Sequence, residues 1–197
     1  MRRIFLSLFL LIGLAACAAE PVWAPDEEVA RAHYATGGPP TITLMTMINT
    51  RSGNGGHAAL LVSGSERLLF DPAGSFHHPR LPERNDVVYG MTDAAVDFYI
   101  DYHSRENWRV IRQDLVVSPE VAEMALRAIK DYGAVPKAFC TNAITNVLKD
   151  LPGFDTIHVT MFPTAAQEAF AKLPGVVRSE YQDDDPDNNG LLLARGL

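Results

Sequence analysis

We predict an α+β fold for this 197-residue chain, with an antiparallel β-sheet packed against helices. Two observations favour this class. Segments with alternating or β-branched apolar residues form strands, and two of them, residues 57–62 and 66–71, are joined by a Ser-Gly-Ser turn typical of a hairpin. Helical patterns occupy stretches of their own, which is the arrangement of α+β domains.

Each predicted element has its own local signal. Strands are recognised by period-two alternation and by Val, Ile and Thr, and helices by an N-capping residue followed by apolar positions three and four residues apart. The predicted strands are residues 41–48, 57–62, 66–71, 87–89, 108–117 and 156–161. The predicted helices are residues 26–35, 93–104, 118–133, a helix that begins at Cys140, and residues 164–173, with caps at Asp26, Thr92, Ser118 and Thr164.

The N-terminus resembles that of a bacterial lipoprotein. Two arginines precede an apolar run over residues 4–14, and Leu14-Ala-Ala-Cys17 resembles a lipobox. The resemblance implies that residues 1–16 are a signal peptide and that Cys17 carries a diacylglycerol. The mature chain would then be anchored in the cell envelope, and Ala18 favours the periplasmic face of the outer membrane. An ordinary secretory peptide, cut near Ala16 or Ala18, is the alternative.

Length and charge restrict the organisation and the partners. We expect one domain over residues 41–175, preceded by a lipidated tether and short helix over residues 17–40 and followed by an acidic tail over residues 176–197. The formal net charge is −7, and no cluster of Lys and Arg is present. A nucleic-acid partner would need a basic surface, so we expect none.

Cys140 is the one cysteine besides Cys17, so a lipidated Cys17 leaves it without an intramolecular disulfide partner. Ala143 and Ile144 share its helical face, which puts the thiol in the first turn of a half-buried helix. The positive end of the helix dipole and the unpaired N–H groups there favour a thiolate and can hold an oxyanion. A small buried hydrophobe is the structural alternative for a lone cysteine.

His57 begins a predicted strand directly after a glycine-rich loop. If residues 63–65 form a three-residue turn, His57 lies opposite Asp71 on the same face of the hairpin. A carboxylate orients an imidazole and raises its basicity, and an imidazole beside a thiol forms a nucleophilic pair. The sequence therefore predicts a catalytic set of Cys140, His57 and Asp71.

This order of residues resembles the circularly permuted papain-like group, which includes permuted bacterial amidases and lecithin:retinol acyltransferase and is related to NlpC-type cell-wall peptidases. The matching stretches are GGHAALLV with His57, ERLLFD with Asp71, and YGAVPKAFCTNAI with Cys140. Tyr132 stands at a distance from Cys140 similar to that of the tyrosine that helps to polarise the substrate in NlpC-type enzymes. Asp71 departs from the His or Asn that is commoner at the third position.

The resemblance implies a permuted papain-like catalytic domain that acts on an amide, ester or thioester through an acyl-cysteine, without a metal or other cofactor. Cys140 would attack the carbonyl, His57 would protonate the leaving group, and the N–H of Cys140 would stabilise the oxyanion. We expect an amidase or peptidase that cleaves cell-wall peptides or acyl amides. An acyltransferase or lipid thioesterase, favoured by a large apolar groove beside Cys140, and a non-catalytic lipoprotein that binds a ligand or partner are the alternatives.

Other candidate ligands are weaker. His77 and His78 lack the spaced partners of a zinc site, and we interpret His33, His103 and His158 as surface or packing residues. Residues 185–190 match the first half of a calcium-binding loop, but Gly196 stands where a bidentate Glu is required. We therefore expect a solvated acidic tail and no bound metal.

Overall fold

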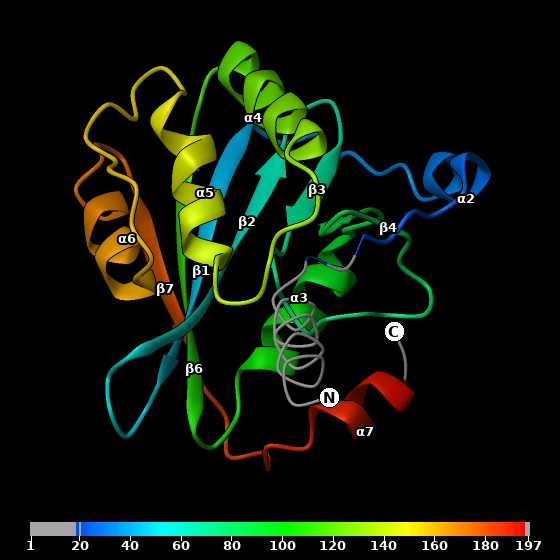
Figure 1. The fold of residues 1–197 in the computed structure, drawn as a ribbon, viewed down its shortest axis with the longest axis vertical. Helices are drawn as coiled ribbons and strands as arrows, with labels where there is room; N and C mark the ends of the chain where they lie inside the picture. Colours follow the sequence, from blue (N-terminus) through cyan, green and yellow to red (C-terminus); the bar gives the residue numbers. More distant parts are fainter. Residues whose placement is uncertain (1–18, 20, 196–197) are drawn as a thin grey trace, which may run out of the picture.

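The computed structural model describes residue 19 and residues 21–195, which form a mixed α+β structure around a seven-stranded antiparallel sheet (Figure 1). The strands are β1 (Thr41–Asn49), β2 (Gly55–Ser63), β3 (Arg67–Phe70), β4 (Glu83–Arg84), β5 (Val87–Val88), β6 (Trp108–Val116) and β7 (Val177–Tyr181). Their order across the sheet is β4-β5-β3-β2-β1-β6-β7. The predicted α+β class, with an antiparallel sheet against helices, is confirmed.

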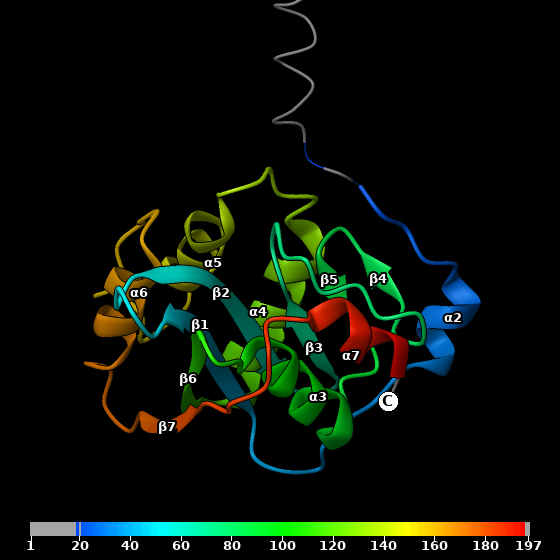
Figure 2. The same ribbon diagram turned by 90° about the horizontal axis from the view of Figure 1, so that it is seen from below.

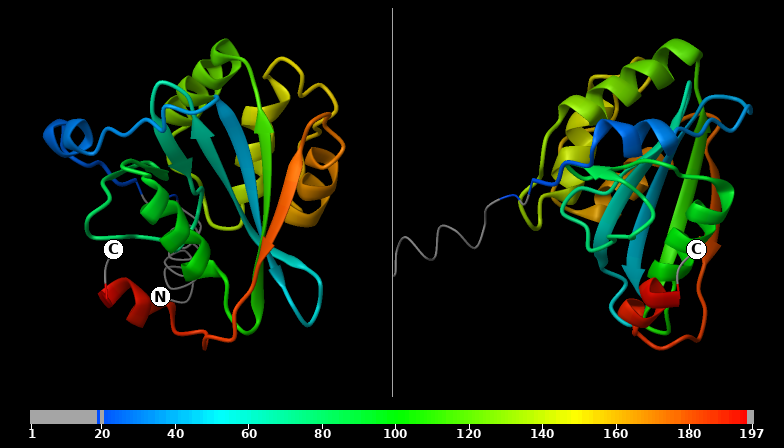
Figure 3. Two further views of the ribbon diagram at one scale, coloured as in Figure 1. Left: turned by 180° about the vertical axis from the view of Figure 1, so that it is seen from behind. Right: turned by 90° about the vertical axis from the view of Figure 1, so that its right-hand side faces the viewer.

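Helices cover both faces of this sheet. They are α2 (Asp26–Arg31), α3 (Asp93–His103), α4 (Pro119–Asp131), α5 (Cys140–Lys149), α6 (Pro163–Phe170) and α7 (Asn189–Arg195). Helices α4, α5 and α6 pack on one face, and α3 with α7 lies on the other, as the views from below and from the side show (Figures 2 and 3). The caps predicted for α3 and α4 are present, because Thr92 and Ser118 accept the N–H groups of Ala95 and Val121.

Two apolar clusters hold the layers together. The side chains of β1 and β2 alternate between them: Leu44 and Leu60 pack towards α4, α5 and α6, while Met45 and Leu61 pack towards α3. Both central strands are therefore buried on both faces, which explains their almost continuous apolar sequence. Each fully buried Leu contributes about 1.5–3 kcal/mol to folding.

Two predictions in the C-terminal third are wrong. Residues 156–161 form no strand and instead run along α5, where the hydroxyl of Thr145 accepts the Thr160 N–H at 3.2 Å. The neighbouring edge of the sheet belongs to β7, which pairs with β6. The predicted domain boundary at residue 176 is also wrong, because residues 177–181 form β7 and belong to the sheet.

Helices α2 and α6 begin differently from the prediction. Pro163 is the first residue of α6 and fixes its φ there, so Thr164 lies inside the helix and caps nothing. Pro25 takes the N-cap position of α2, and Asp26 pairs with Arg84 instead of capping the helix. Both helices are shorter than predicted.

The segment before α2 is fastened to the sheet edge. Ala24 donates its N–H to the Glu83 carbonyl at 2.9 Å, and Asn85 donates to the Val22 carbonyl at 3.0 Å. The Arg84 guanidinium lies 4.6 Å from the centre of the Trp23 ring. The predicted signal peptide and Cys17 lie outside the described residues, and among the described helices none has the length and apolar character needed to cross a membrane.

Candidate active site

Two glycines let His57 enter the sheet beside bulky neighbours. A Cβ on Gly56 would lie 2.5 Å from the ring of Trp108, and one on Gly55 would lie 2.6 Å from Pro163. Neither position has room for a side chain, so the glycine-rich loop passes closely under α6 and the start of β6. His57 follows, paired with Met47 of β1.

The register of the β2–β3 hairpin differs from the prediction. Ser63 pairs with Arg67, so the three-residue turn is residues 64–66 and His57 is not directly opposite Asp71. The observed register moves the partner of each β2 residue by two positions. Because side chains alternate with a period of two, Asp71 stays on the same face as His57, as a diagonal neighbour. The carboxylate Oδ1 of Asp71 lies 2.6 Å from Nε2 of His57.

Asp71 is held from several sides. It is 4% exposed, and Oδ1 also accepts the hydroxyl of Tyr99 at 2.6 Å. Its own N–H donates to the Asp86 carbonyl at 2.8 Å. A Cβ on Gly74 would lie 1.9 Å from Oδ2, so only glycine lets the chain turn back against the carboxylate.

Cys140 is the first residue of α5 and is 7% exposed. The first N–H to bond a carbonyl at this end is that of Ala143, which donates to Phe139, so the N–H of Cys140 lies ahead of the helical ladder. Leu60 is the last residue of β2 that pairs with β3. Beyond it, the N–H of Ala58 in β2 is directed at the Cys140 sulfur. His57 also acts on the thiol and lowers its pKa, and Nδ1 is the ring nitrogen left for the sulfur because Nε2 is engaged with Asp71.

These contacts shift the proton affinities of the pair. Burial opposes the charge on His57, but the charge of Asp71 and its hydrogen bond, with smaller contributions from Cys140, raise the pKa of His57 to about 10. Burial likewise opposes a thiolate, but His57, the Thr141 hydroxyl and the Ala58 N–H lower the pKa of Cys140 from 9.0 to about 7. Burial opposes the charge on Asp71 too, yet His57, His103 and Tyr99 keep its pKa below the ordinary value. A thiolate and an imidazolium therefore coexist between about pH 7 and pH 10.

Helix α3 supplies two site residues that sequence reasoning missed. The Tyr99 hydroxyl donates to Asp71, a contact that was not predicted. His103, interpreted as a surface or packing residue, lies one turn later and stacks on His57 with ring centres 6.1 Å apart. Their spacing of four residues on one helix was the available signal.

Tyr132 is not brought to this cluster. It ends α4, packs against Phe70 with ring centres 5.5 Å apart, and lines a hollow together with residues of the C-terminal half of α5. Cys140 lies at the opposite end of that helix. The structure therefore gives Tyr132 no contact with Cys140 or His57.

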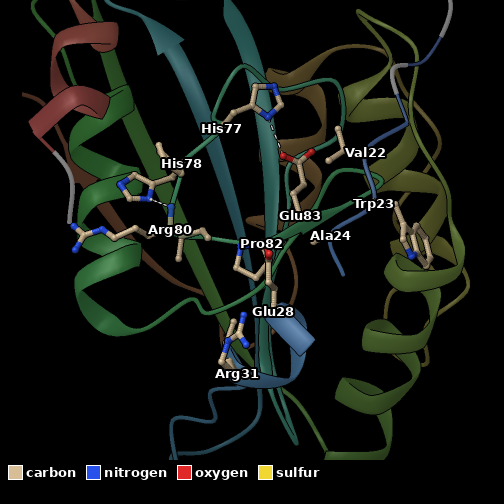
Figure 4. Close-up of a pocket in the computed structure, with 13 residues that line it drawn as sticks. Val22, Trp23, Ala24, Glu28, Arg31, His77, His78, Arg80, Pro82 and Glu83 are labelled. Atoms are coloured by element: carbon tan, nitrogen blue, oxygen red, sulfur yellow. Dashed lines mark hydrogen bonds and ion pairs between the residues drawn. The ribbon is translucent and has the colours of Figure 1, made fainter. Parts of the chain in front are cut away.

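A cavity of about 300 Å³ opens beside the dyad and is lined by His57, Gly74, His103, Trp108 and Asn189, among others. A larger hollow of about 850 Å³ lies between residues 22–32 and 77–83, and Figure 4 shows that the rings of His77 and His78 point in different directions there. None of Cys140, His57 and Asp71 lines this larger hollow. We regard the smaller cavity as the candidate substrate site because His57 lines it, although Cys140 is not among its lining residues.

In the described part of the chain, no cluster of possible metal ligands lies at Cys140 and His57. One set of carboxylates, Asp101, Asp183 and Asp185, is close enough to share a cation. Arg105 already pairs with two of them, at 3.7 Å to Asp101 and 3.0 Å to Asp185. This set is a salt-bridge cluster that ties the C-terminal segment to α3.

Comparisons with family models, with curated proteins and with solved structures find no match for this chain. The geometry of Cys140, His57 and Asp71 is therefore the ground on which a function can be assigned.

Proposed function

We propose that this protein is a cysteine-nucleophile hydrolase, an amidase or peptidase that cleaves an amide bond through an acyl-cysteine intermediate. The observation that carries the proposal is the position of His57 between Asp71, whose Oδ1 lies 2.6 Å from Nε2, and the Cys140 thiol, whose pKa His57 lowers. A carboxylate, an imidazole and a thiol in series are the parts that nucleophilic acyl transfer requires.

The acylation step uses each group once. The Cys140 thiolate attacks the carbonyl carbon and forms a C–S bond, while the negative charge moves to the carbonyl oxygen. The N–H of Cys140, at the N-terminus of α5, faces that developing charge. When the C–N bond breaks, His57 transfers its Nδ1 proton to the leaving amine, and the thioester remains on Cys140.

Deacylation reverses the proton path. Neutral His57 takes a proton from water at Nδ1, the hydroxide attacks the thioester, and the carboxylic acid leaves as the C–S bond breaks. Throughout both steps Asp71 holds the Nε2 proton of His57, which keeps the other nitrogen directed at sulfur. Atoms and charge balance with water as the one co-reactant.

The fold and the location are part of the proposal. The chain order of His57 on β2, Asp71 after β3 and Cys140 at the start of α5 is that of the permuted papain-like group. This supports cell-wall peptides or acyl amides as the substrate class. A lipid anchor at Cys17 would hold the enzyme at the periplasmic face of the outer membrane.

The acyltransferase or lipid thioesterase alternative calls for a large apolar groove beside Cys140. The cavity next to His57 measures about 300 Å³ and is lined by histidine, serine and asparagine as well as by Trp108. Its size and mixed lining favour a peptide or a short acyl amide over a long acyl chain.

The test uses a Cys17→Ser chain, in which Cys140 is the sole thiol, and p-nitrophenyl acetate as an activated acyl donor. We expect intact-mass spectrometry to detect one acetyl group, removable by hydroxylamine, with loss of the adduct in Cys140→Ser. A panel of N-acyl amino acid p-nitroanilides then reads out amide cleavage. Absence of a Cys140-dependent adduct in folded protein would contradict the proposal and favour the ligand-binding alternative.

A further inference from the structure

Asp86 is a half-buried acidic residue between the two loops that carry the catalytic groups. Its carbonyl accepts the N–H of Asp71 at 2.8 Å. Its carboxylate accepts the N–H of Val135, five residues before Cys140, at 2.7 Å, and the Ala73 N–H acts on it more weakly. One residue thus connects the segment that follows β3 with the segment that leads into α5.

Residues with positive φ lie in the turn of Asp86 and in the two segments that it connects. Strands β4 and β5 pair Arg84 with Val87, so Asn85 and Asp86 form a two-residue hairpin turn, and both have positive φ, 46° and 66°. Turns of this kind prefer glycine at the second position. The other non-glycine residues with positive φ in the described chain are Ala73 and Ala138, which flank Asp71 and Cys140 in the two connected loops.

An aspartate at this position is unfavourable for folding in two respects. A side chain at positive φ is strained where glycine would fit. Burial, with further contributions from Glu83 and Asp71, raises the pKa of Asp86 to about 6, although the Val135 N–H opposes the shift. A residue kept at a cost to stability suggests a role in the site and not in the fold.

We propose that Asp86 is a positioning residue that fixes the Cys140 loop against the Asp71 loop and thereby sets the thiol–imidazole geometry. This inference rests on the proposed function, because it concerns the same nucleophile. A carboxylate accepts two N–H groups at once, whereas an asparagine in its place would offer one acceptor oxygen and a competing donor. Asp86→Asn therefore keeps the size but loses one of the two side-chain bonds, and Asp86→Gly loses both while relieving the strained turn.

The test measures the rate of Cys140 alkylation by iodoacetamide, together with thermal stability, in the Cys17→Ser chain. We expect the rate at pH 7 to fall about fivefold in Asp86→Asn and about tenfold or more in Asp86→Gly, with an unchanged or higher Tm. Glu83→Gln is the matched control. Glu83 and Asp86 both line a small hollow with Ala73 and Val135, but the Glu83 side chain pairs with His77 and not with the segment that leads into α5. Its alkylation rate should stay within twofold of the parent.

The pH profile gives a second readout. Glu83, His77 and Lys137 line the hollow with Asp86, and the charges of Glu83 and Asp71 act on its carboxylate. Burial is the largest influence on the Asp86 proton. As the pH falls through about 6, the parent rate should lose about fivefold more than the tenfold per pH unit due to Cys140, because Asp86 also becomes protonated. In Asp86→Asn it should fall tenfold per unit.

Parent-like alkylation in both Asp86 variants, or losses of rate and Tm in parallel, would overturn the positioning role. A parent thiol without a lowered pKa would instead refute the proposed function, whatever the Asp86 variants do. The two failures are therefore distinguishable in one set of experiments.

Discussion

His57 and His103 differ in proton affinity although they lie side by side. Their rings stack with centres 6.1 Å apart and planes 19° from parallel, and both are half-buried. The pKa of His57 is raised to about 10, whereas burial, opposed by the charge of Asp71, lowers the pKa of His103 to about 4. Burial lowers the pKa of both rings, and the charge of Asp71 raises the pKa of both.

Hydrogen bonding makes the difference. His57 Nε2 meets the Asp71 carboxylate at 2.6 Å, while Nδ1 of His103 donates to the Tyr99 carbonyl at 2.9 Å, a neutral acceptor. A carboxylate in contact outweighs burial, and a carboxylate at longer range does not. The site therefore keeps one imidazole charged beside the thiol and its neighbour neutral, so that the two do not repel each other.

The largest loss of turnover is expected when His57 is removed. His57→Ala takes away both the base and the charge that stabilises the thiolate, so we expect deacylation and amide cleavage to fall by about 10³-fold or more. The measurement is turnover of the p-nitroanilide panel. His33→Ala, which removes a histidine with a side chain 60% exposed, should leave turnover unchanged, and equal losses in the two variants would speak against a catalytic dyad.

In Asp71→Asn, the pKa of His57 should fall towards that of His103. Without the carboxylate, burial is no longer offset, so the pKa of His57 should fall below 6.5 and turnover should decrease about 10–100-fold. NMR titration of the imidazole protons measures the first effect directly. Asp101→Asn, a carboxylate on α3 outside the site, is the control. A His57 pKa that stays near 10 in Asp71→Asn would refute the role given to Asp71.

Tyr99→Phe tests the support of Asp71. The variant loses the 2.6 Å hydrogen bond to Oδ1, so the carboxylate binds a proton more readily and holds His57 less firmly. We expect a 3–10-fold loss of turnover and a loss of about 1 kcal/mol in the free energy of unfolding. Tyr102→Phe removes a hydroxyl from the same helix that lacks contact with Asp71, and a loss of turnover as large as that of Tyr99→Phe would contradict this account.

His103→Asn should change turnover least, by less than about threefold, but it should change the pH dependence of stability. A histidine whose pKa is lowered by folding takes up a proton on unfolding, so its contribution to stability is lost as the pH falls from 6.5 towards 4. Denaturant unfolding at several pH values should give a flatter profile for the variant over this window, by up to about 3 kcal/mol. An unchanged profile would mean that His103 is protonated in the folded chain.

The sequence predicts some parts of this molecule better than others. The strand and helix that carry His57 and Cys140 have strong local signals, since alternation and helical spacing are short-range patterns. The pairing of β2 with β3 was misjudged because the turn could lie at residues 63–65 or 64–66, and the side-chain period of two kept Asp71 on the correct face all the same. Tyr99 and His103 share one helix face, but their place at the site, like that of Asp86, depends on tertiary packing that no local pattern records. Residues 156–161 have a strand-like composition but run along α5, and β7 takes the place beside β6.

The central claim is that Cys140 is a thiolate made by His57. The most direct measurement is the rate of Cys140 alkylation by iodoacetamide against pH in the Cys17→Ser chain and in its His57→Ala variant. We predict an inflection near pH 7 in the parent and a shift to about 9 or above in the variant, with folding verified by circular dichroism. Superimposable profiles, or a parent thiol that reacts only above its ordinary pKa, would contradict the account.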